Sequence, residues 1–263
     1  MLRKHIYSGA WYPADRAGIE KYIVNTEKKV NATGCICPHA GWIYSGKIAG
    51  NVYSRLPGYD TYILLGPNHT GLGPKISIFP DGIWEMPLGN VEVDTETARN
   101  ILSVSEFAQS DYTAHNREHS LEVQLPFIQY FNPDCKIVPV LIKTDEYEIC
   151  ADLANSIYSA VKKSSKKILI VISTDMTHYE SIDYAKKQDQ FAIDEILSLN
   201  AGKLIETVQK KGITMCGVAP AVTGLLVSKR LGAVKSELID YGHSGNITGD
   251  TAAVVTYAGF IIK

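Results

Sequence analysis

The chain has 263 residues, of which 45% are apolar and 21% charged, and 26 basic side chains nearly balance 28 acidic ones; this is typical of a globular protein and gives no reason to expect a nucleic acid as partner. The apolar run 252–262 is too short to cross a bilayer, residues 1–15 lack the apolar stretch of a secretory signal, and five cysteines cannot all pair within the chain. We expect one cytoplasmic domain over residues 1–263, with reduced thiols and no membrane contact.

The first thirty residues carry an aromatic segment and an amphipathic one. Residues 1–13 include HIYSGAWYP, and we expect these rings to cap the core rather than to border a pocket. Over residues 14–30, apolar side chains such as Ile19, Tyr22 and Ile23 recur near helical spacing, which predicts a helix.

The segment GCICPHAGWIYSG predicts a strand, a turn that bears a histidine, and a helix. Gly34–Cys37 is apolar, and Pro38 should end the strand because proline lacks a backbone donor and keeps its predecessor extended. His39 follows in the turn, and Ser45 is the candidate N-cap of a helix over residues 47–55. Ligands of open α/β sheets bind outside the carboxyl ends of strands, which is where this histidine is expected.

The same order of strand and histidine occurs twice more. The apolar strand predicted over residues 61–66 is followed by His69, and the strand predicted over residues 167–173 is followed by His178. Three histidines at equivalent strand ends favour one shared site over three unrelated loop residues.

The middle of the chain predicts a hairpin and a capped helix. Residues 75–79 and 82–86 are expected to be its two strands, joined by Pro80-Asp81-Gly82. Asp94 is the expected N-cap of a helix that runs through residue 103.

The segment DYTAHNREHSLEVQLPFIQYF, residues 111–131, concentrates polar side chains. A helix here would place Glu118, His119 and Glu122 on one face. Pro126 should kink or end that helix. Polar residues beside a helix break indicate a segment that faces a site.

The remaining elements alternate between strands and helices. Strands are predicted over residues 136–142, 236–241 and 251–262, and helices over residues 146–161, 184–199, 201–211 and 217–230. This order predicts a single three-layer α/β/α domain with a mixed, mostly parallel sheet.

His39 and His69 are the strongest candidates for metal ligands, since each lies in a short turn that contains proline. Imidazole suits Zn, Cu, Fe and Ni, and two histidines with an anionic third ligand leave coordination positions open for chemistry. Cys216, Asp175 and Glu118 all qualify as the third ligand. Cys216 precedes a predicted helix, whose dipole would lower the pKa of the thiol.

Asp175 and His178 form a second pair. A carboxylate near a histidine can orient the ring and raise its basicity, so His178 is a candidate proton shuttle. A Ser-His-Asp hydrolase is less attractive, because the sequence contains no G-x-S-x-G motif.

The motifs PHAGWIYSG, LLGPNHTG, EHSLEVQLPFIQ, STDMTHY, MCGVAPAVTGLL and YGHSGNITGD occur in this order, and with them the chain resembles the Memo (mediator of cell motility) family along nearly its whole length. The resemblance implies a fold similar to class III extradiol ring-cleavage dioxygenases, whose non-haem Fe(II) is held by two His and one Glu. It implies that His39 and His69 correspond to the two histidine ligands. Cys216 corresponds to the position where Memo proteins have Cys and the dioxygenases have Glu.

The resemblance also implies roles for three further residues. Asp175 and His178 correspond to a pair in the pocket, with His178 aligned to the acid/base of the dioxygenases, and His119 lies in a family motif near the pocket. A thiolate beside Fe(II) and O₂ is itself oxidisable, which argues against ring cleavage. A soft sulfur ligand widens the plausible metals from Fe(II) to Cu or Zn.

Three functional hypotheses follow. The first is a redox enzyme with Fe(II) or Cu, or alternatively Zn, at His39, His69 and Cys216. The second is a non-catalytic scaffold that binds a metal or a peptide, and the third, weaker one is a zinc hydrolase in which His178 activates a metal-bound water. The resemblance further implies a small-molecule or peptide ligand in the pocket, and AMMECR-type and radical-SAM proteins as partners.

Overall fold

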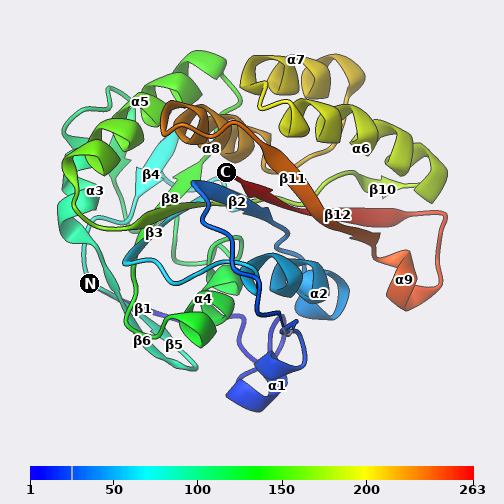
Figure 1. Ribbon diagram of the computed structural model, residues 1–263, viewed down its shortest axis with the longest axis horizontal. Helices are drawn as coiled ribbons and strands as arrows, with labels where there is room; N and C mark the ends of the chain where they lie inside the picture. Colours follow the sequence, from blue (N-terminus) through cyan, green and yellow to red (C-terminus); the bar gives the residue numbers. More distant parts are fainter. Residues whose placement is uncertain (25) are drawn as a thin grey trace.

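Parallel pairing of four buried strands forms the centre of the molecule (Figure 1). The computed structural model describes residues 1–24 and 26–263. The central strands, in spatial order, are β8 (Lys136–Ile142), β3 (Thr61–Pro67), β9 (Ile168–Ser173) and β2 (Gly34–Cys37). Their nearly unbroken apolar runs are typical of parallel strands that are covered on both faces.

Shorter strands extend this centre on both sides into one mixed sheet, in the order β1-β5-β6-β8-β3-β9-β2-β12-β10, with β11 on β12 and β4 between β7 and β8. The outer pairs include antiparallel ones, such as β12 on β2. The bounds are β1 (Leu2–Lys4), β4 (Ile76–Ile78), β5 (Ile83–Met86), β6 (Gly89–Val93), β7 (Ala108–Ser110), β10 (His178–Glu180), β11 (Ser236–His243) and β12 (Val254–Ile262).

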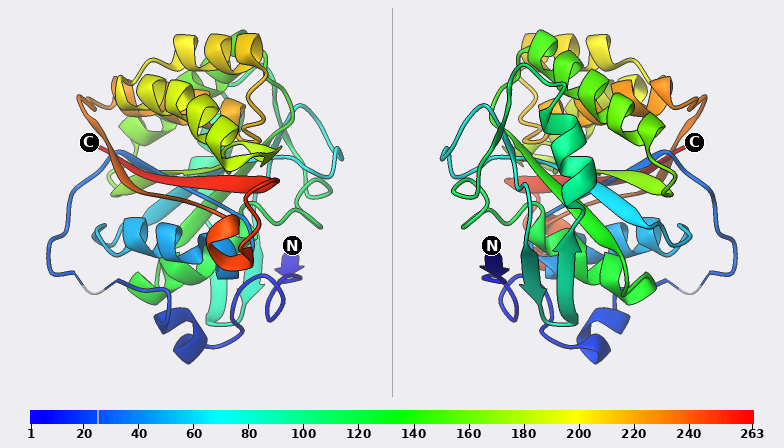
Figure 2. Two further views of the ribbon diagram at one scale, coloured as in Figure 1. Left: turned by 90° about the vertical axis from the view of Figure 1, so that its right-hand side faces the viewer. Right: turned by 90° about the vertical axis from the view of Figure 1, so that its left-hand side faces the viewer.

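Helices cover both faces of the sheet (Figure 2). One face carries α3 (Thr95–Leu102), α5 (Tyr147–Lys163), α6 (Ile182–Leu197), α7 (Ala201–Lys211) and α8 (Val218–Arg230). The other face carries α1 (Arg16–Glu20), α2 (Trp42–Tyr53) and α4 (Leu125–Phe131), and α9 (Gly245–Thr248) lies between β11 and β12. The predicted α/β/α class with a mixed, mostly parallel sheet is confirmed.

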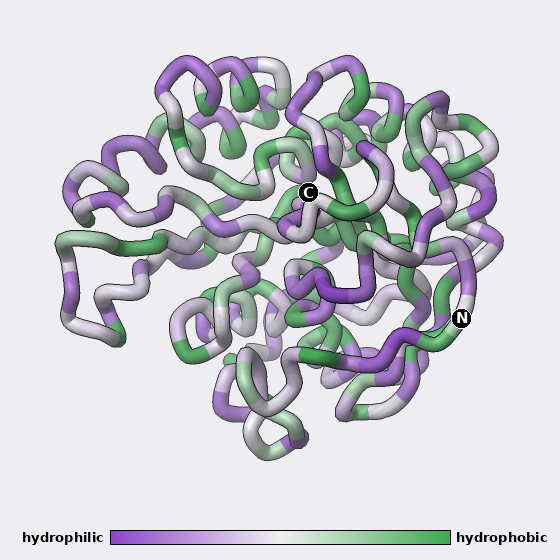
Figure 3. The backbone as a smooth tube through the Cα atoms, turned by 180° about the vertical axis from the view of Figure 1, so that it is seen from behind, coloured by the Kyte–Doolittle hydropathy of each residue, from purple (hydrophilic) through white to green (hydrophobic). Residues whose placement is uncertain are grey.

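The central sheet divides the core into two layers. In β9, Ile170 and Ile172 pack into the cluster under α5 and α8, whereas Leu169 and Val171 pack into the cluster under α2 and α4. This alternation follows from the period of two along a strand. Figure 3 shows the consequence, with hydrophobic residues along the central strands and mixed residues along the outer helices.

The predicted N-cap of α2 is wrong. The helix begins at Trp42 after Gly41, and the Ser45 hydroxyl inside it donates to the carbonyl of Ala40 at 2.9 Å. The reason is a distant contact, because the Trp42 N–H is satisfied by the carbonyl of Trp11 at 2.7 Å. A helix start supported in this way needs no capping side chain.

The helix predicted over residues 14–30 is mostly wrong. Only α1 forms there, with Asp15 as N-cap, and residue 25 of the predicted helix lies outside the described residues. Beyond α1 the chain runs against α2, where a Cβ on Gly50 would lie 1.9 Å from the carbonyl oxygen of Tyr22. Tertiary packing here overrides a helical pattern.

The predicted hairpin also connects the wrong strands. β4 pairs with β7 and β8, whereas β5 pairs with β1 and β6. Pro80-Asp81-Gly82 connects the two predicted strands, as expected. The strands it connects, β4 and β5, lie in different parts of the sheet and do not pair with each other. A turn signal gives the position of a reversal and not the partner of the strand that follows.

Residues 111–131 do not form one continuous helix. Turns lead to a short 3₁₀-helix, Glu122–Gln124, and then to α4, where Pro126 lies in the first turn. Proline is tolerated there because its missing N–H would have had no partner in the helix. The expectation that Glu118, His119 and Glu122 share a helix face is therefore wrong.

The predicted N-cap at Asp94 is confirmed, since its side chain accepts the N–H of Thr97 at the start of α3. Asn200 caps α7 in the same way by accepting the N–H of Lys203. The described residues include no helix that is long and apolar enough to cross a membrane.

A buried ion pair holds the N-terminal segment against residues 115–124. Arg3 Nη1 lies 2.8 Å from Glu122 Oε2, and the guanidinium also donates to the carbonyls of His115 and Glu118. The other oxygen of Glu122 accepts from the N–H groups of Ile6 and Tyr7 and from the hydroxyl of Tyr12. One carboxylate thus organises two segments that are more than a hundred residues apart.

We predict that Glu122→Gln lowers the free energy of unfolding by about 3–5 kcal/mol, because it leaves the Arg3 charge buried without its counter-ion. Urea unfolding at neutral pH measures this loss. The matched control is Glu92→Gln, which removes an exposed pair with Lys136 and should cause no measurable change. Equal effects of the two substitutions would contradict the role assigned to the buried pair.

Candidate metal centre

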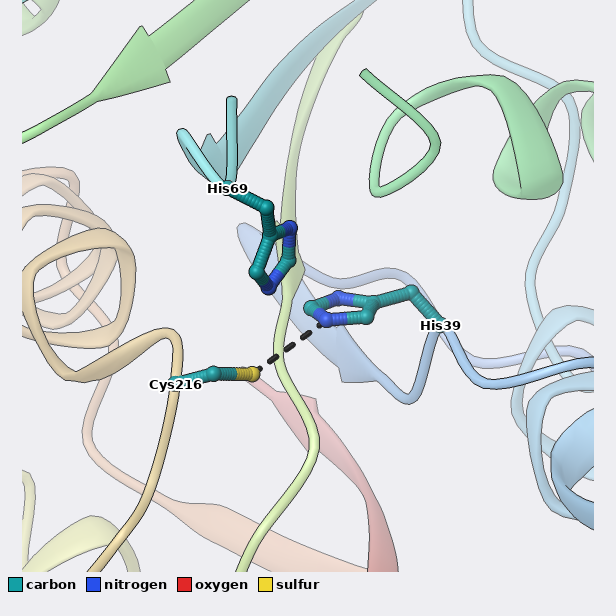
Figure 4. A group of neighbouring side chains, drawn as sticks. All are labelled: His39, His69 and Cys216. Carbon is teal, nitrogen blue, oxygen red and sulfur yellow. Dashed lines mark hydrogen bonds between the residues drawn. The ribbon is translucent and has the colours of Figure 1, made fainter. Parts of the chain in front are cut away.

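Three side chains with metal-binding atoms converge at the carboxyl edge of the sheet (Figure 4). His39 Nε2 lies 3.2 Å from Cys216 Sγ, and the rings of His39 and His69 are 5.1 Å apart at an angle of 79°. One ligand atom from each of the three residues lies within 4.8 Å of the others. We call these three residues the His₂Cys cluster.

Strand register brings the two histidines together. Cys37 lies opposite Ser173, and Leu65 lies opposite Ile172, so that the turns after β2 and β3 both start beside the end of β9. Cys216 comes from the loop before α8. The next residue, Gly217, permits this approach, since a Cβ there would lie 2.6 Å from the Ser173 carbonyl oxygen.

The hydrogen bonds of His39 fix its tautomer. Its Nδ1 lies 2.9 Å from Ser173 Oγ, whose only proton is donated to the carbonyl of Ser120 at 2.6 Å. His39 must therefore donate from Nδ1, and its Nε2 keeps a lone pair directed at Cys216. Burial, and then the charge of His69, keep the pKa of His39 well below its usual value, which favours this neutral ring.

His69 is oriented by a carboxylate. Its Nδ1 lies 2.8 Å from Glu118 Oε1, and its backbone N–H donates to the other oxygen at 2.6 Å. Burial opposes the charge of Glu118, but the hydrogen bond and charge of His69 outweigh it and lower the pKa of Glu118 to about 2. With Nδ1 engaged, His69 offers Nε2 as its ligand atom, as in carboxylate–histidine–metal arrangements.

His119 lies against the cluster without joining it. Its ring stacks on that of His69, with the ring centres 4.5 Å apart, and packs against that of Trp11, with the ring centres 4.4 Å apart. Burial, and then the neighbouring His39, lower the pKa of His119 to about 3. With His69 and Glu118 it forms a second group of ligand-type atoms within 4.8 Å of one another, but the hydrogen bond between His69 and Glu118 already uses two of those atoms.

Asp175 lies beside the His₂Cys cluster and is buried next to His39. Asp175 Oδ1 accepts the N–H groups of His39 and Ala40, at 2.8 and 3.3 Å. Burial raises the pKa of Asp175. The expectation of a lowered thiol pKa is wrong for Cys216 without a metal, because burial and then the charge of Asp175 raise it.

His178 borders the same cavity, but carbonyls orient it and not Asp175. Its Nδ1 lies 2.7 Å from the carbonyl oxygen of Met176 and 2.9 Å from that of Thr214. Both partners only accept, so Nδ1 carries the proton and Nε2 is left to accept one. The predicted role of His178 as a proton shuttle stays a prediction.

A cavity of about 1080 Å³ opens in front of the cluster. All six side chains predicted for the site border it: His39, His69, His119, Asp175, His178 and Cys216. Four aromatic residues complete much of its wall: Trp11, Tyr44, Tyr179 and Tyr257. The structure thus brings together residues from turns that are up to two hundred positions apart.

Sequence reasoning missed the residues that support the cluster. Ser173, which lies 2.9 Å from His39 Nδ1, does carry a signal, because it is a polar residue at the end of an apolar strand. Gln124 donates to both Ser173 Oγ and the carbonyl of Pro38, and no local pattern indicates this. The prediction for the aromatic N-terminal segment holds for one ring and fails for another. Tyr12 is buried in the core as expected, whereas Trp11 borders the cavity.

The fold and the cluster define an α/β protein with candidate metal ligands at the carboxyl edge of a parallel sheet. A family model described as Memo-like protein matches residues 3–261. A MEMO1 family protein of Methanobrevibacter smithii is 40% identical, with all of both chains covered. Another, of Aquifex aeolicus, is 41% identical over 99% of this chain and 98% of that one. The chain belongs to the Memo family.

Among solved structures, an uncharacterized protein of Escherichia coli has a similar fold. It superimposes with a TM-score of 0.56 at 9% identity, over 87% of this chain and 99% of that one. At this identity the likeness shows the fold alone. The similarity to extradiol dioxygenases stays an expectation.

We predict that stability falls in two steps on acidification of the metal-free protein. His119 binds a proton in the unfolded chain below about pH 6.5 but in the folded chain only near pH 3, so stability is lost between these values. Glu118 stays ionised in the folded chain to about pH 2, so its contribution, complete above about pH 4.5, is lost below that. Each group contributes a slope of up to about 1.4 kcal/mol per pH unit.

Urea unfolding of the metal-free protein between pH 7 and pH 3 separates the two groups. His119→Gln should reduce the slope from pH 6.5 downward without abolishing it, because the pKa values of His39 and His115 are lowered too. Glu118→Gln should reduce only the slope below pH 4.5. A wild-type protein whose stability is constant between pH 6.5 and 4.5 would contradict the depressed pKa of His119.

Proposed function

We propose that this Memo-family protein binds a metal ion through Nε2 of His39, Nε2 of His69 and Sγ of Cys216. One observation carries the proposal: the Nδ1 atoms of both histidines are occupied by built-in acceptors, so both Nε2 lone pairs are available next to a thiol. Ligands around a tetrahedral ion at about 2.0–2.3 Å lie roughly 3.3–3.8 Å apart. The 3.2 Å between His39 and Cys216 needs little adjustment.

The donor set restricts the choice of ion. Two imidazoles and a sulfur suit Fe(II), Cu or Zn and disfavour Mg and Ca, which prefer oxygen. We propose Fe(II) or Cu as the functional ion and Zn as the alternative. Three protein ligands would leave coordination positions for other molecules, as is typical of catalytic rather than structural sites, and all three residues border the cavity.

We further propose that the protein is a metal-dependent redox enzyme for a ligand bound in the cavity. The ion would supply redox or Lewis-acid chemistry. The protein's own part is to position groups around it: His178, held through Nδ1 by two carbonyls, accepts or returns a proton at Nε2. Trp11 and His119, whose ring centres are 4.4 Å apart, both border the cavity and would contact its ligand. The cavity and the proton acceptor favour this function over a non-catalytic scaffold.

We predict near-stoichiometric iron or copper in protein purified without oxygen, and its loss in His39→Ala and Cys216→Ala, because each variant removes a direct ligand. Elemental analysis measures the content. His5→Ala and Cys135→Ala are matched controls, since neither residue is part of the His₂Cys cluster, and both should retain the metal.

Oxygen uptake by the loaded protein, with catechols and with thiols as reductants, then tests the redox part of the proposal. Stoichiometric metal without oxygen consumption or redox cycling would favour the scaffold. Hydrolytic activity restored by zinc alone would favour a hydrolase. Protein that cannot be loaded with any of the three metals would contradict the metal site.

We predict that Ser173→Ala and Glu118→Gln lower metal affinity by about 10–100-fold without removing a ligand. Ser173→Ala removes the acceptor that fixes the tautomer of His39. Glu118→Gln removes the negative charge beside His69 and replaces one of the two accepting oxygens by an NH₂ donor. Competition with a chelator measures the affinity. Ser156→Ala is the control, as this buried hydroxyl bonds only within α5. Unchanged affinity in both variants would show that the tautomers are not fixed in this way.

A further inference from the structure

Tyrosines form one wall of the cavity. Tyr44 comes from the first turn of α2, Tyr179 from β10 and Tyr257 from β12. Tyr257 is buried, whereas Tyr44 and Tyr179 are 39% and 78% exposed. The pKa of Tyr257 is raised by burial and then by Asp175, Tyr44 and Tyr179, so each of these groups lies near Tyr257. We call the three residues the tyrosine wall.

The cavity carries acidic but no basic side chains of the lysine or arginine type among the described residues that line it. Asp175 lies at the inner end and exposed Asp250 at the rim. Asp250 accepts the N–H of Ala252 at 2.8 Å, and it takes part in none of the ion pairs among the described residues. An anionic ligand would therefore find no cationic side chain of that type in the lining.

The amino end of α2 also borders the cavity, and its positive partial charge would favour an anion. Two of its N–H groups are already used, however. Trp42 donates to the carbonyl of Trp11 and Tyr44 to that of Gly41, at 2.7 and 2.9 Å. This end of the helix therefore has little hydrogen-bonding capacity left for a ligand.

Tyr179, which lines the cavity, has its backbone in an unfavourable conformation. Its φ is +60°, which is rare for a bulky residue. The pairing of β10 with β12 shifts register here, with His178 opposite Val255 and Glu180 opposite Val254. Bulges and strained residues of this kind often re-aim a side chain at a functional site.

We propose that the cavity binds an organic cation that carries an aromatic ring. The ring would pack against the tyrosine wall and Trp11, and the ammonium group would lie between the phenol faces and Asp250. Aromatic faces attract cations through their quadrupole, and the rim carboxylate adds a direct charge interaction. The proposal concerns the cavity wall and does not depend on an ion in the cluster.

Three probes that share a phenol ring test the proposal on metal-free protein: tyramine is a cation, p-cresol is neutral and 4-hydroxyphenylacetate is an anion. Ligand-observed NMR titration at pH 7 gives their dissociation constants. We expect tyramine to bind about tenfold more tightly than 4-hydroxyphenylacetate, with p-cresol between them. Tyramine binding no tighter than the anion would overturn the proposal.

Two variants separate the contributions of ring and charge. Tyr179→Ala should weaken all three probes about threefold or more, and Asp250→Asn should weaken only tyramine, whose affinity should move toward that of p-cresol without reaching it. Tyr184→Ala and Asp183→Asn are matched controls on α6, since neither residue lines the cavity. Tyramine binding that neither Tyr179→Ala nor Asp250→Asn changes would overturn the proposal. Because the probes are measured on metal-free protein, their results can be interpreted even if the protein cannot be loaded with metal.

Discussion

The parallel pairing of β2, β9 and β3 is the constraint on which the candidate site depends. Because Cys37 lies opposite Ser173, the turn after β2 begins where β9 ends, and the Ser173 hydroxyl lies within hydrogen-bonding distance of the His39 ring. That hydroxyl has one proton, which is donated to the carbonyl of Ser120. The histidine must therefore donate from Nδ1. Strand register, a property of the whole sheet, thus decides which nitrogen of one ring faces Cys216.

The N-terminal segment is held against the site by an interaction of a different kind. A buried ion pair such as Arg3–Glu122 is rarely more stabilising than an apolar replacement of the same volume. Its value here is positional, because one carboxylate accepts two backbone N–H groups and a hydroxyl from the segment. The same segment carries Trp11, whose ring packs against His119. The carbonyl of Trp11 accepts the N–H of Trp42 at the start of α2. One electrostatic anchor therefore shapes both the cavity wall and the first turn of a helix.

Features that depend on neighbouring residues could be predicted from the sequence, whereas features that depend on contacts between distant segments could not. Strand ends at His39 and His69 follow from short apolar runs stopped by proline, and the N-cap at Asp94 follows from a side chain three residues from its partner. The start of α2 is missed because its support is the carbonyl of Trp11, thirty-one positions earlier. The helical pattern of residues 14–30 fails where Gly50 lets the chain pass close to α2. Gln124, which joins Ser173 to Pro38, has no signal in its own neighbourhood.

Burial determines the protonation states of two members of the His₂Cys cluster. It raises the pKa of the Cys216 thiol and lowers that of the His39 imidazole, so both groups are uncharged and neither has the cost of a buried ion. A divalent cation would reverse the preference of the thiol, because coordination to a metal deprotonates sulfur outright. Binding would then release a proton at Cys216 and none at His39, whose Nε2 lone pair is already available. The fold therefore prepares His39 in its binding form and leaves Cys216 to be ionised by the metal itself.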